Sequence, residues 1–190
     1  MEFLVTDLED VRYRASVWNP DYVVSLLDVE FKSTLNFQHQ ASHYKAFFND
    51  LEHPDYLSGP KLEQIRQILE FSQDFVKDSR VLVHCHAGIS RSTAMTLGMM
   101  VQHGEKEMDA LEHLLQIRPI ATPNKLILQH IDTVLGSQLK TIVEAWCTIS
   151  NDWWQEILNA QLTRSSVQLQ ELKTMQNQSF QDFRQRMEPE

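Results

Sequence analysis

Two side chains separated by five residues, Cys85 and Arg91, together supply the groups needed to accept a phosphoryl group. A cysteine thiolate is a strong nucleophile, and a guanidinium is a planar fork that binds two oxygens of a phosphate at once. The intervening residues, 86–90, are mostly small or polar and include Gly88. That composition favours a short loop whose backbone can approach an anion closely. We therefore take Cys85 as the candidate nucleophile and Arg91 as the candidate phosphate-binding residue.

The segments on either side of this loop predict the elements that position it. Residues 81–84 begin with an apolar, β-favouring run, and residues 93–101 are largely apolar, which predicts a strand before the loop and a buried helix after it. A loop that leads into a helix N-terminus directs backbone N–H groups at an anion, and the helix dipole adds positive potential. The same groups favour the thiolate form of Cys85 over the thiol. A buried, unreactive cysteine is the alternative interpretation, but the complete pattern favours a nucleophile.

The remaining residues of this stretch have expected roles in binding the phosphate and in releasing the sulfur. Ser92 offers a hydroxyl that can donate a hydrogen bond to the thiolate when water hydrolyses a phosphorylated cysteine, although an ordinary first-turn serine is the alternative. Backbone N–H groups are expected to line the phosphate site at His86, Ala87, Gly88, Ile89, Ser90 and Arg91.

An acid is also required, because the leaving oxygen of a phosphate ester must be protonated. Asp50 and Asp55 are the candidates, since both lie in the polar segment 49–59, upstream of the helix that leads back to the nucleophile strand. A loop in that place suits a mobile lid that carries an acid. Asp50 is preferred because it follows closely on the apolar pair Phe47–Phe48, and Asp55 stays open as the alternative.

Histidines near the loop raise the question of a metal site. His84 and His86 flank the cysteine, and His39 and His43 have the i, i+4 spacing of neighbours on a helix. Neither pair comes with clear third and fourth ligands, so we expect no metal and no other cofactor. His84 is expected to end the strand with its ring bonded to the backbone.

Hydrophobic spacing and turn residues predict the rest of the domain. Residues 3–6 and 22–27 are expected strands, and a further strand should end near Phe47–Phe48. Pro60 and Pro123 are each expected at the first position of a helix. The helices after these prolines, and the others beyond the loop, are predicted at about 60–77, 106–117, 122–136 and 139–149.

Composition limits the classes of partner. The chain has 190 residues, a formal net charge of −9 and two cysteines, Cys85 and Cys147. An acidic chain is a poor ligand for nucleic acid or for an anionic membrane surface, so neither is an expected partner. No signal peptide or membrane span is recognisable, and two cysteines do not make a disulfide scaffold, so a reducing cytoplasm is the expected location.

The sequence changes character after residue 149. Residues 150–190 contain no glycine, many glutamines and sparse apolar residues. This pattern predicts one or two amphipathic helices, which either pack on the domain or bind a partner or self-associate. The expected organisation is therefore a catalytic domain over residues 1–149 and a helical extension over residues 150–190.

The stretch from His84 to Ser92 resembles the HCxxGxxRS signature of cysteine-dependent protein phosphatases of the tyrosine and dual-specificity branch. Asn49–Asp50 is similar to the general-acid loop of that family. Residues 87–94, together with 121–124, look most like small bacterial tyrosine-phosphatase-like proteins. The resemblance covers about residues 1–149, and it implies an α/β fold with a central, mostly parallel sheet flanked by helices. It also implies catalysis without a metal.

We therefore expect a phosphatase that acts on phosphotyrosine in proteins through a cysteinyl-phosphate, with phosphoserine and phosphothreonine left open. The loop lacks the lysines of the phosphoinositide-directed branch, because His86 and Ile89 occupy positions that are basic there. A phosphate-recognising adaptor with a degenerate site is one alternative. A phosphatase of nucleotides or inositol phosphates on the same fold is another.

Overall fold

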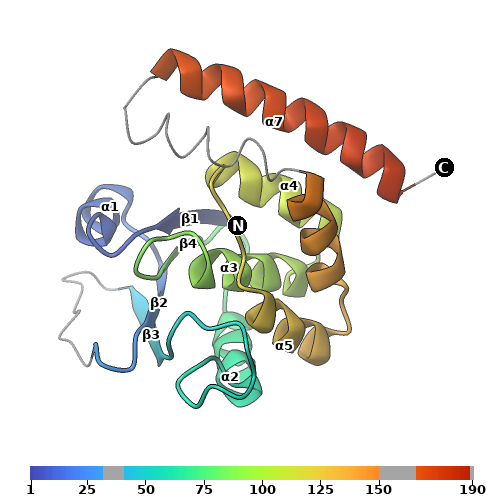
Figure 1. Cartoon of the computed structure of the whole chain (residues 1–190). Helices are drawn as coiled ribbons and strands as arrows, with labels where there is room; N and C mark the ends of the chain where they lie inside the picture. Colours follow the sequence, from blue (N-terminus) through green and yellow to red (C-terminus); the bar gives the residue numbers. More distant parts are fainter. Residues whose placement is uncertain (32–40, 150–165, 189–190) are drawn as a thin grey trace.

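The computed structural model describes residues 1–31, 41–149 and 166–188, and a parallel sheet forms the centre of this part of the chain (Figure 1). A helix over residues 139–149 follows α5. The elements are, in chain order, β1 (Glu2–Thr6), α1 (Val11–Trp18), β2 (Tyr22–Leu27), β3 (Ser42–Phe47), α2 (Leu62–Ser72), β4 (Arg80–His84), α3 (Arg91–Gln102), α4 (Glu107–Ile117), α5 (Lys125–Leu135) and α7 (Ser166–Met187).

The sheet has four strands in the order β1-β4-β2-β3, and every neighbouring pair is parallel. Val83 of β4 lies beside Val5 on one side and Val24 on the other. Because β4 is flanked by strands and covered on both faces, the continuous apolar run Val81–Val83 is buried. The loop after β4 therefore starts at the carboxyl edge of the sheet, where parallel α/β folds place their ligands.

Helices cover both faces of the sheet, as the expected α/β class requires. On one face, Val11 and Ala15 of α1 pack against residues of β2 and β4. On the other face lie α2, α3, α4 and α5, which form the larger apolar cluster with the opposite side of the strands. α3 is enclosed in this layer, because residues 91–100 are all buried. Its Gly98 lies against α5, where a Cβ would come within 2.7 Å of Ile131 Cδ1.

The predicted helix starts at Pro60 and Pro123 are wrong. α2 begins two residues after Pro60, and Lys61 N donates to Gln64 Oε1 at 3.1 Å across its first turn. α5 begins two residues after Pro123, because the Asn124 side chain caps it by accepting from Ile127 N at 3.0 Å. A side chain that accepts from an unpaired N–H group at the helix start fixes where the helix begins. The φ angle that a proline ring imposes is a weaker influence.

The extension contains a long helix, α7, that packs on its own domain. Phe180 and Phe183 are buried against Trp146, with ring centroids 5.2 and 5.6 Å from the indole. Arg184 pairs with Glu112 of α4 at 3.0 Å and also with Asp109. The first part of the predicted extension, residues 150–165, lies outside the described residues. Across the ranges 1–31, 41–149 and 166–188, no helix combines the length and apolar character needed to cross a bilayer.

Candidate active site

Cys85 begins the loop between β4 and α3, with only 1% of its surface exposed. Its sulfur accepts a hydrogen bond from Gly88 N at 3.2 Å and lies 3.2 Å from Ser92 Oγ. The loop therefore turns back over the sulfur, and the first turn of α3 supplies a hydroxyl next to it. The structure brings the predicted nucleophile and the predicted thiolate stabiliser into contact.

The carbonyl groups of the loop are held outward by donors from other parts of the chain. Arg118 contributes two of these bonds, and its role was not predicted from the sequence. The bonds run from Leu8 N to His86 O (3.0 Å), from Arg118 Nη2 to Ala87 O (3.0 Å), from Arg118 Nε to Gly88 O (2.9 Å), from Thr122 N to Ile89 O (2.9 Å) and from Asn124 N to Ser90 O (3.3 Å). The carbonyls are thus occupied outside the loop, while the Gly88 N–H points inward to the sulfur.

Gly88 is the one loop residue whose lack of a side chain is required. Its φ is +67°, which a residue with a Cβ adopts with strain. A Cβ at this position would also come within 2.6 Å of the Thr6 carbonyl carbon and oxygen. The loop is therefore packed directly on the end of β1. Any larger residue at position 88 would lift the loop away from the sheet.

Arg91 is the largest fully buried side chain and belongs to the first turn of α3. Its Nη1 donates to the Phe48 carbonyl at 2.7 Å and to Asp28 Oδ1, also at 2.7 Å. Its Nε has no hydrogen-bond acceptor among the described residues. A buried guanidinium N–H without an acceptor is costly, and an anion bound in the loop would satisfy it. Asp28, which orients this arginine, was not among the residues predicted from the sequence.

Of the two candidate acids, Asp50 lies beside the loop and Asp55 does not. Asp50 Oδ1 accepts from Ser90 Oγ at 2.7 Å and from Asn124 Nδ2 at 2.8 Å, and its Oδ2 lies 3.9 Å from Arg91 Nε. The side chain of Asp55 is 87% exposed and pairs only weakly with His53, at 3.5 Å. Asn124 also caps α5, so one buried amide ties the acid loop to a helix start. Its role was likewise missed, because the sequence signal pointed to Pro123 instead.

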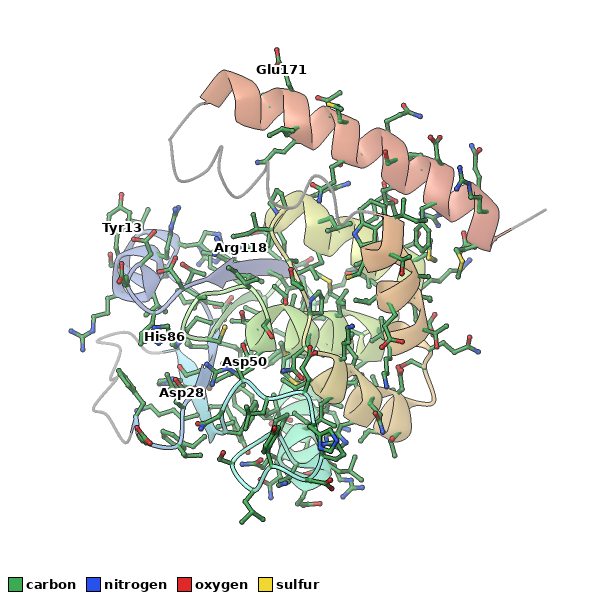
Figure 2. All side chains as sticks on the ribbon, in the orientation of Figure 1. Tyr13, Asp28, Asp50, His86, Arg118 and Glu171 are labelled. Carbon is green, nitrogen blue, oxygen red and sulfur yellow. The ribbon has the colours of Figure 1, made fainter. Side chains whose placement is uncertain are left out.

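The charged and polar residues around the loop gather at one side of the molecule. Figure 2 shows Asp28, Asp50 and His86 near one another, with Arg118 set apart from them. A shallow depression lies there, and its apolar walls come from Leu8, Leu27 and Phe31, while Asp28, His86 and Arg91 supply its polar ones. This depression lies next to the phosphate-binding loop, on the side of His86.

The described histidines that raised the question of a metal site do not belong to a cluster of metal ligands. His84 is fully buried, and burial lowers the pKa of its ring to about 4. Its Nδ1 contacts the Cys85 carbonyl at 3.4 Å, so the expected bond to the backbone is present. His43 lies on β3 rather than on a helix, and His39 lies outside the described residues. In the part of the chain that the structure describes, no three His, Cys, Asp or Glu side chains are arranged to bind a metal.

Comparison with known proteins connects this geometry to a family. The family model described as dual specificity phosphatase, catalytic domain, matches residues 21–133, which include the whole loop from Cys85 to Arg91. The chain belongs to the dual-specificity phosphatase family. This membership confirms the predicted superfamily of cysteine-dependent phosphatases, while the narrower likeness to small bacterial proteins stays a prediction.

Curated relatives of this dual-specificity phosphatase include the protein phosphatase Slingshot homolog 3 of Rattus norvegicus and of Mus musculus. Each is 30% identical over 129 residues, which make up 65% of this chain and 20% of the relative. The chain therefore spans about a fifth of the length of these relatives. The comparison covers their shared region and not their other parts.

Solved structures of other phosphatases confirm the fold. They include the human tyrosine phosphatase-like serine/threonine/tyrosine-interacting protein, with a TM-score of 0.57, 18% identity and coverage of 70% of this chain and 91% of that chain. The Yvh1 phosphatase domain from Chaetomium thermophilum has a TM-score of 0.53 and 18% identity, covering 70% and 90% of the two chains. PTPMT1 in complex with PI(5)P has a TM-score of 0.51 and 16% identity, covering 76% and 93%. At these identities the likeness establishes the fold alone.

Proposed function

We propose that this dual-specificity phosphatase hydrolyses phosphotyrosine in proteins, through a cysteinyl-phosphate and without a metal. The observation that carries the proposal is the buried Arg91 Nε, which has no acceptor among the described residues and lies at a loop in which Gly88 N donates to the Cys85 sulfur. A dianionic phosphate would accept from the guanidinium and from the amides at once. Phosphoserine and phosphothreonine remain further candidates for the same chemistry.

In the first step, Cys85 Sγ attacks phosphorus and the bond from phosphorus to the ester oxygen breaks. The N–H groups of residues 86–91 and the Arg91 guanidinium bind the oxygens of the transferred group, where charge is redistributed in the transition state. Asp50 gives its proton to the departing oxygen, so that the alcohol leaves neutral. Its place beside Ser90 Oγ, at 2.7 Å, keeps the carboxyl at the rim of the loop.

In the second step, water attacks the phosphorus of the cysteinyl-phosphate and the bond from sulfur to phosphorus breaks. Asp50, now ionised, takes a proton from that water. Ser92 Oγ, 3.2 Å from the sulfur, donates a hydrogen bond to the thiolate as it leaves. Inorganic phosphate is released and the thiolate is restored.

The depression beside the loop supports an aromatic substrate. Leu8, Leu27 and Phe31 form its apolar walls, and these offer apolar contact to the ring of a tyrosyl side chain at the mouth of the loop. A solved structure of PTPMT1 holds PI(5)P, so the fold also accommodates a lipid headgroup. Here the absence of lysine from the loop and the net charge of −9 favour a protein substrate over inositol lipids and nucleic acid.

The decisive experiment compares Cys85→Ser with Cys147→Ser, a matched change at a half-buried cysteine outside the loop. Cys85→Ser should abolish turnover of p-nitrophenyl phosphate and retain tungstate binding, while Cys147→Ser should keep turnover. Unimpaired turnover by Cys85→Ser would exclude the nucleophile. Wild-type protein that binds tungstate but turns over no phosphopeptide would indicate the adaptor. A panel of phosphotyrosine peptide, nucleotides and inositol phosphates then separates the substrate classes.

We further propose that residues 1–149 form the catalytic domain and that the protein works in a reducing cytoplasm, because a catalytic thiolate is lost on oxidation. The extension is proposed as a stabilising element, since the described part of it packs on the domain through Phe180 and Phe183. Binding of a partner, or self-association, by this extension stays a prediction.

A further inference from the structure

A chain of three polar side chains runs across the sheet to the nucleophile. Ser25 on β2 is fully buried, and its Oγ lies 2.6 Å from His84 Nε2 and 2.7 Å from His43 Nε2. His43 is on β3, the edge strand next to β2. His84 is the last residue of β4 and directly precedes Cys85. The chain therefore begins at a half-buried histidine and ends at the residue that enters the catalytic loop.

Only one assignment of donors and acceptors satisfies the hydrogen bonds among His43, Ser25 and His84. His84 Nδ1 contacts the Cys85 carbonyl, which is an acceptor, so this nitrogen carries the proton. In a neutral ring His84 Nε2 is then an acceptor, and Ser25 must donate its hydroxyl proton to it. Ser25 Oγ has no second proton, so His43 Nε2 must be protonated and donate to Ser25. The proton position at His43 thereby selects the tautomer at His84.

We propose that His43 and Ser25 are positioning residues that hold His84 in the tautomer whose Nδ1–H anchors the Cys85 carbonyl. This inference rests on the proposed function of Cys85. With the anchor in place, the Cys85 carbonyl is held away from the sulfur and the strand end is fixed under the loop amides. Without it, the other tautomer would turn a lone pair of His84 Nδ1 toward the carbonyl oxygen, and the start of the loop would move.

Burial, more than the nearby charges, keeps both rings neutral near pH 7. Burial and the nearby Lys45 lower the pKa of His43 to about 4. Burial also lowers the pKa of His84 to about 4, where His43 and Arg91 oppose a charge on the ring and Asp7 favours one. When both rings are neutral, His43 donates to Ser25 and Ser25 donates to His84. A proton added to His84 Nε2 would instead make His84 the donor to Ser25.

The direct test is the position of the ring protons, measured by heteronuclear NMR of the histidine rings in the wild-type protein. We expect His84 to carry its proton on Nδ1 and His43 to carry its proton on Nε2. A proton on Nε2 of His84 at neutral pH would overturn the proposal. This measurement needs no turnover, so it stays informative if the proposed reaction is wrong and also if a variant fails to fold.

The kinetic test uses His43→Leu, which removes the donor to Ser25, and His43→Gln, whose amide N–H can replace Nε2–H. His43→Leu and Ser25→Ala should each lower kcat for p-nitrophenyl phosphate about tenfold with little change in KM, since one oriented hydrogen bond is lost. His43→Gln should keep most of the activity. The double variant should be no worse than Ser25→Ala, because both changes break one chain.

Two controls separate positioning from general damage. Ser72→Ala removes an equally buried hydroxyl that donates to the Leu69 carbonyl at 2.8 Å, and His113→Leu removes a half-buried ring that contacts Glu105. Both should leave kcat unchanged. Alkylation of Cys85 by iodoacetamide at neutral pH should be slower in His43→Leu than in the wild type, and unchanged in His43→Gln. Equal losses in Leu and Gln variants, or none in either, would refute the chain, whereas an inactive wild type would instead refute the proposed function.

Discussion

Asp28 Oδ1 lies 2.7 Å from Arg91 Nη1, and this ion pair joins the end of β2 to the first turn of α3. The arginine is 2% exposed and its partner 40% exposed, so the pair reaches from the interior to the rim of the site. With Nη1 occupied by Asp28 and by the Phe48 carbonyl, Nε is left without an acceptor among the described residues and lies 3.9 Å from Asp50 Oδ2. The orientation of the Arg91 guanidinium is therefore set by residues outside the loop itself.

The first prediction concerns this orientation. Asp28→Ala should lower kcat/KM for p-nitrophenyl phosphate about tenfold, because Arg91 loses the partner that orients its fork. Asp28→Asn should lose less, since its amide oxygen can still accept from Nη1. Steady-state kinetics of the two variants check this. An alanine variant with wild-type kcat/KM would show that the Phe48 carbonyl alone orients the arginine.

The second prediction assigns the acid. Asp50→Asn should lower kcat about a hundredfold, because the leaving oxygen is no longer protonated. It should also remove the fall of kcat at alkaline pH that comes from ionisation of the acid. Asp55→Asn is the matched control, since Asp55 is exposed in the same loop. Profiles of kcat against pH for both variants decide the assignment, and it is reversed if the loss follows Asp55 instead.

The third prediction is a loss of stability in acid. The pKa of His84 is lowered from 6.5 to about 4 by burial, so between these values the unfolded chain binds a proton that the folded chain does not. The free energy of unfolding should therefore fall as pH drops from 6.5 toward 4, by about 3 kcal/mol for this residue. Urea unfolding at several pH values measures it. His43→Gln should make the fall shallower, because a second ring with a lowered pKa is removed.

The fourth prediction concerns the helical extension. Phe180→Ala should lower the free energy of unfolding by about 3 kcal/mol, because it empties the space between Phe183 and Trp146. Met175→Ala, on the same helix, is the control and should change it by less than about 0.5 kcal/mol, since Met175 is 59% exposed. Thermal and urea unfolding measure both. Equal, small effects would show that α7 is not docked in solution.

Residues that lie close together in the sequence could be assigned from it alone. The strand 81–84, the loop and the helix beyond are consecutive, so the contact of Cys85 with Ser92 follows from the local turn of the chain. Short apolar, β-favouring runs likewise located β1 and β2, and the apolar pair Phe47–Phe48 marked the end of β3. The parallel sheet followed from the resemblance of this loop to a family, and the four described strands confirm it. Local preferences failed at Pro60 and Pro123, where nearby side chains decide the helix starts.

The sequence by itself determined the loop between β4 and α3 and the class of fold, because these depend on neighbours along the chain. Only the tertiary structure showed that Asp50 and not Asp55 faces the loop, that Asp28 orients Arg91, and that α7 packs on its own domain. It also brought His43 and Ser25 together behind His84. Each of these contacts joins residues far apart in sequence. Such contacts depend on how strands and helices pack in the tertiary structure, and this packing leaves no periodic pattern in the sequence.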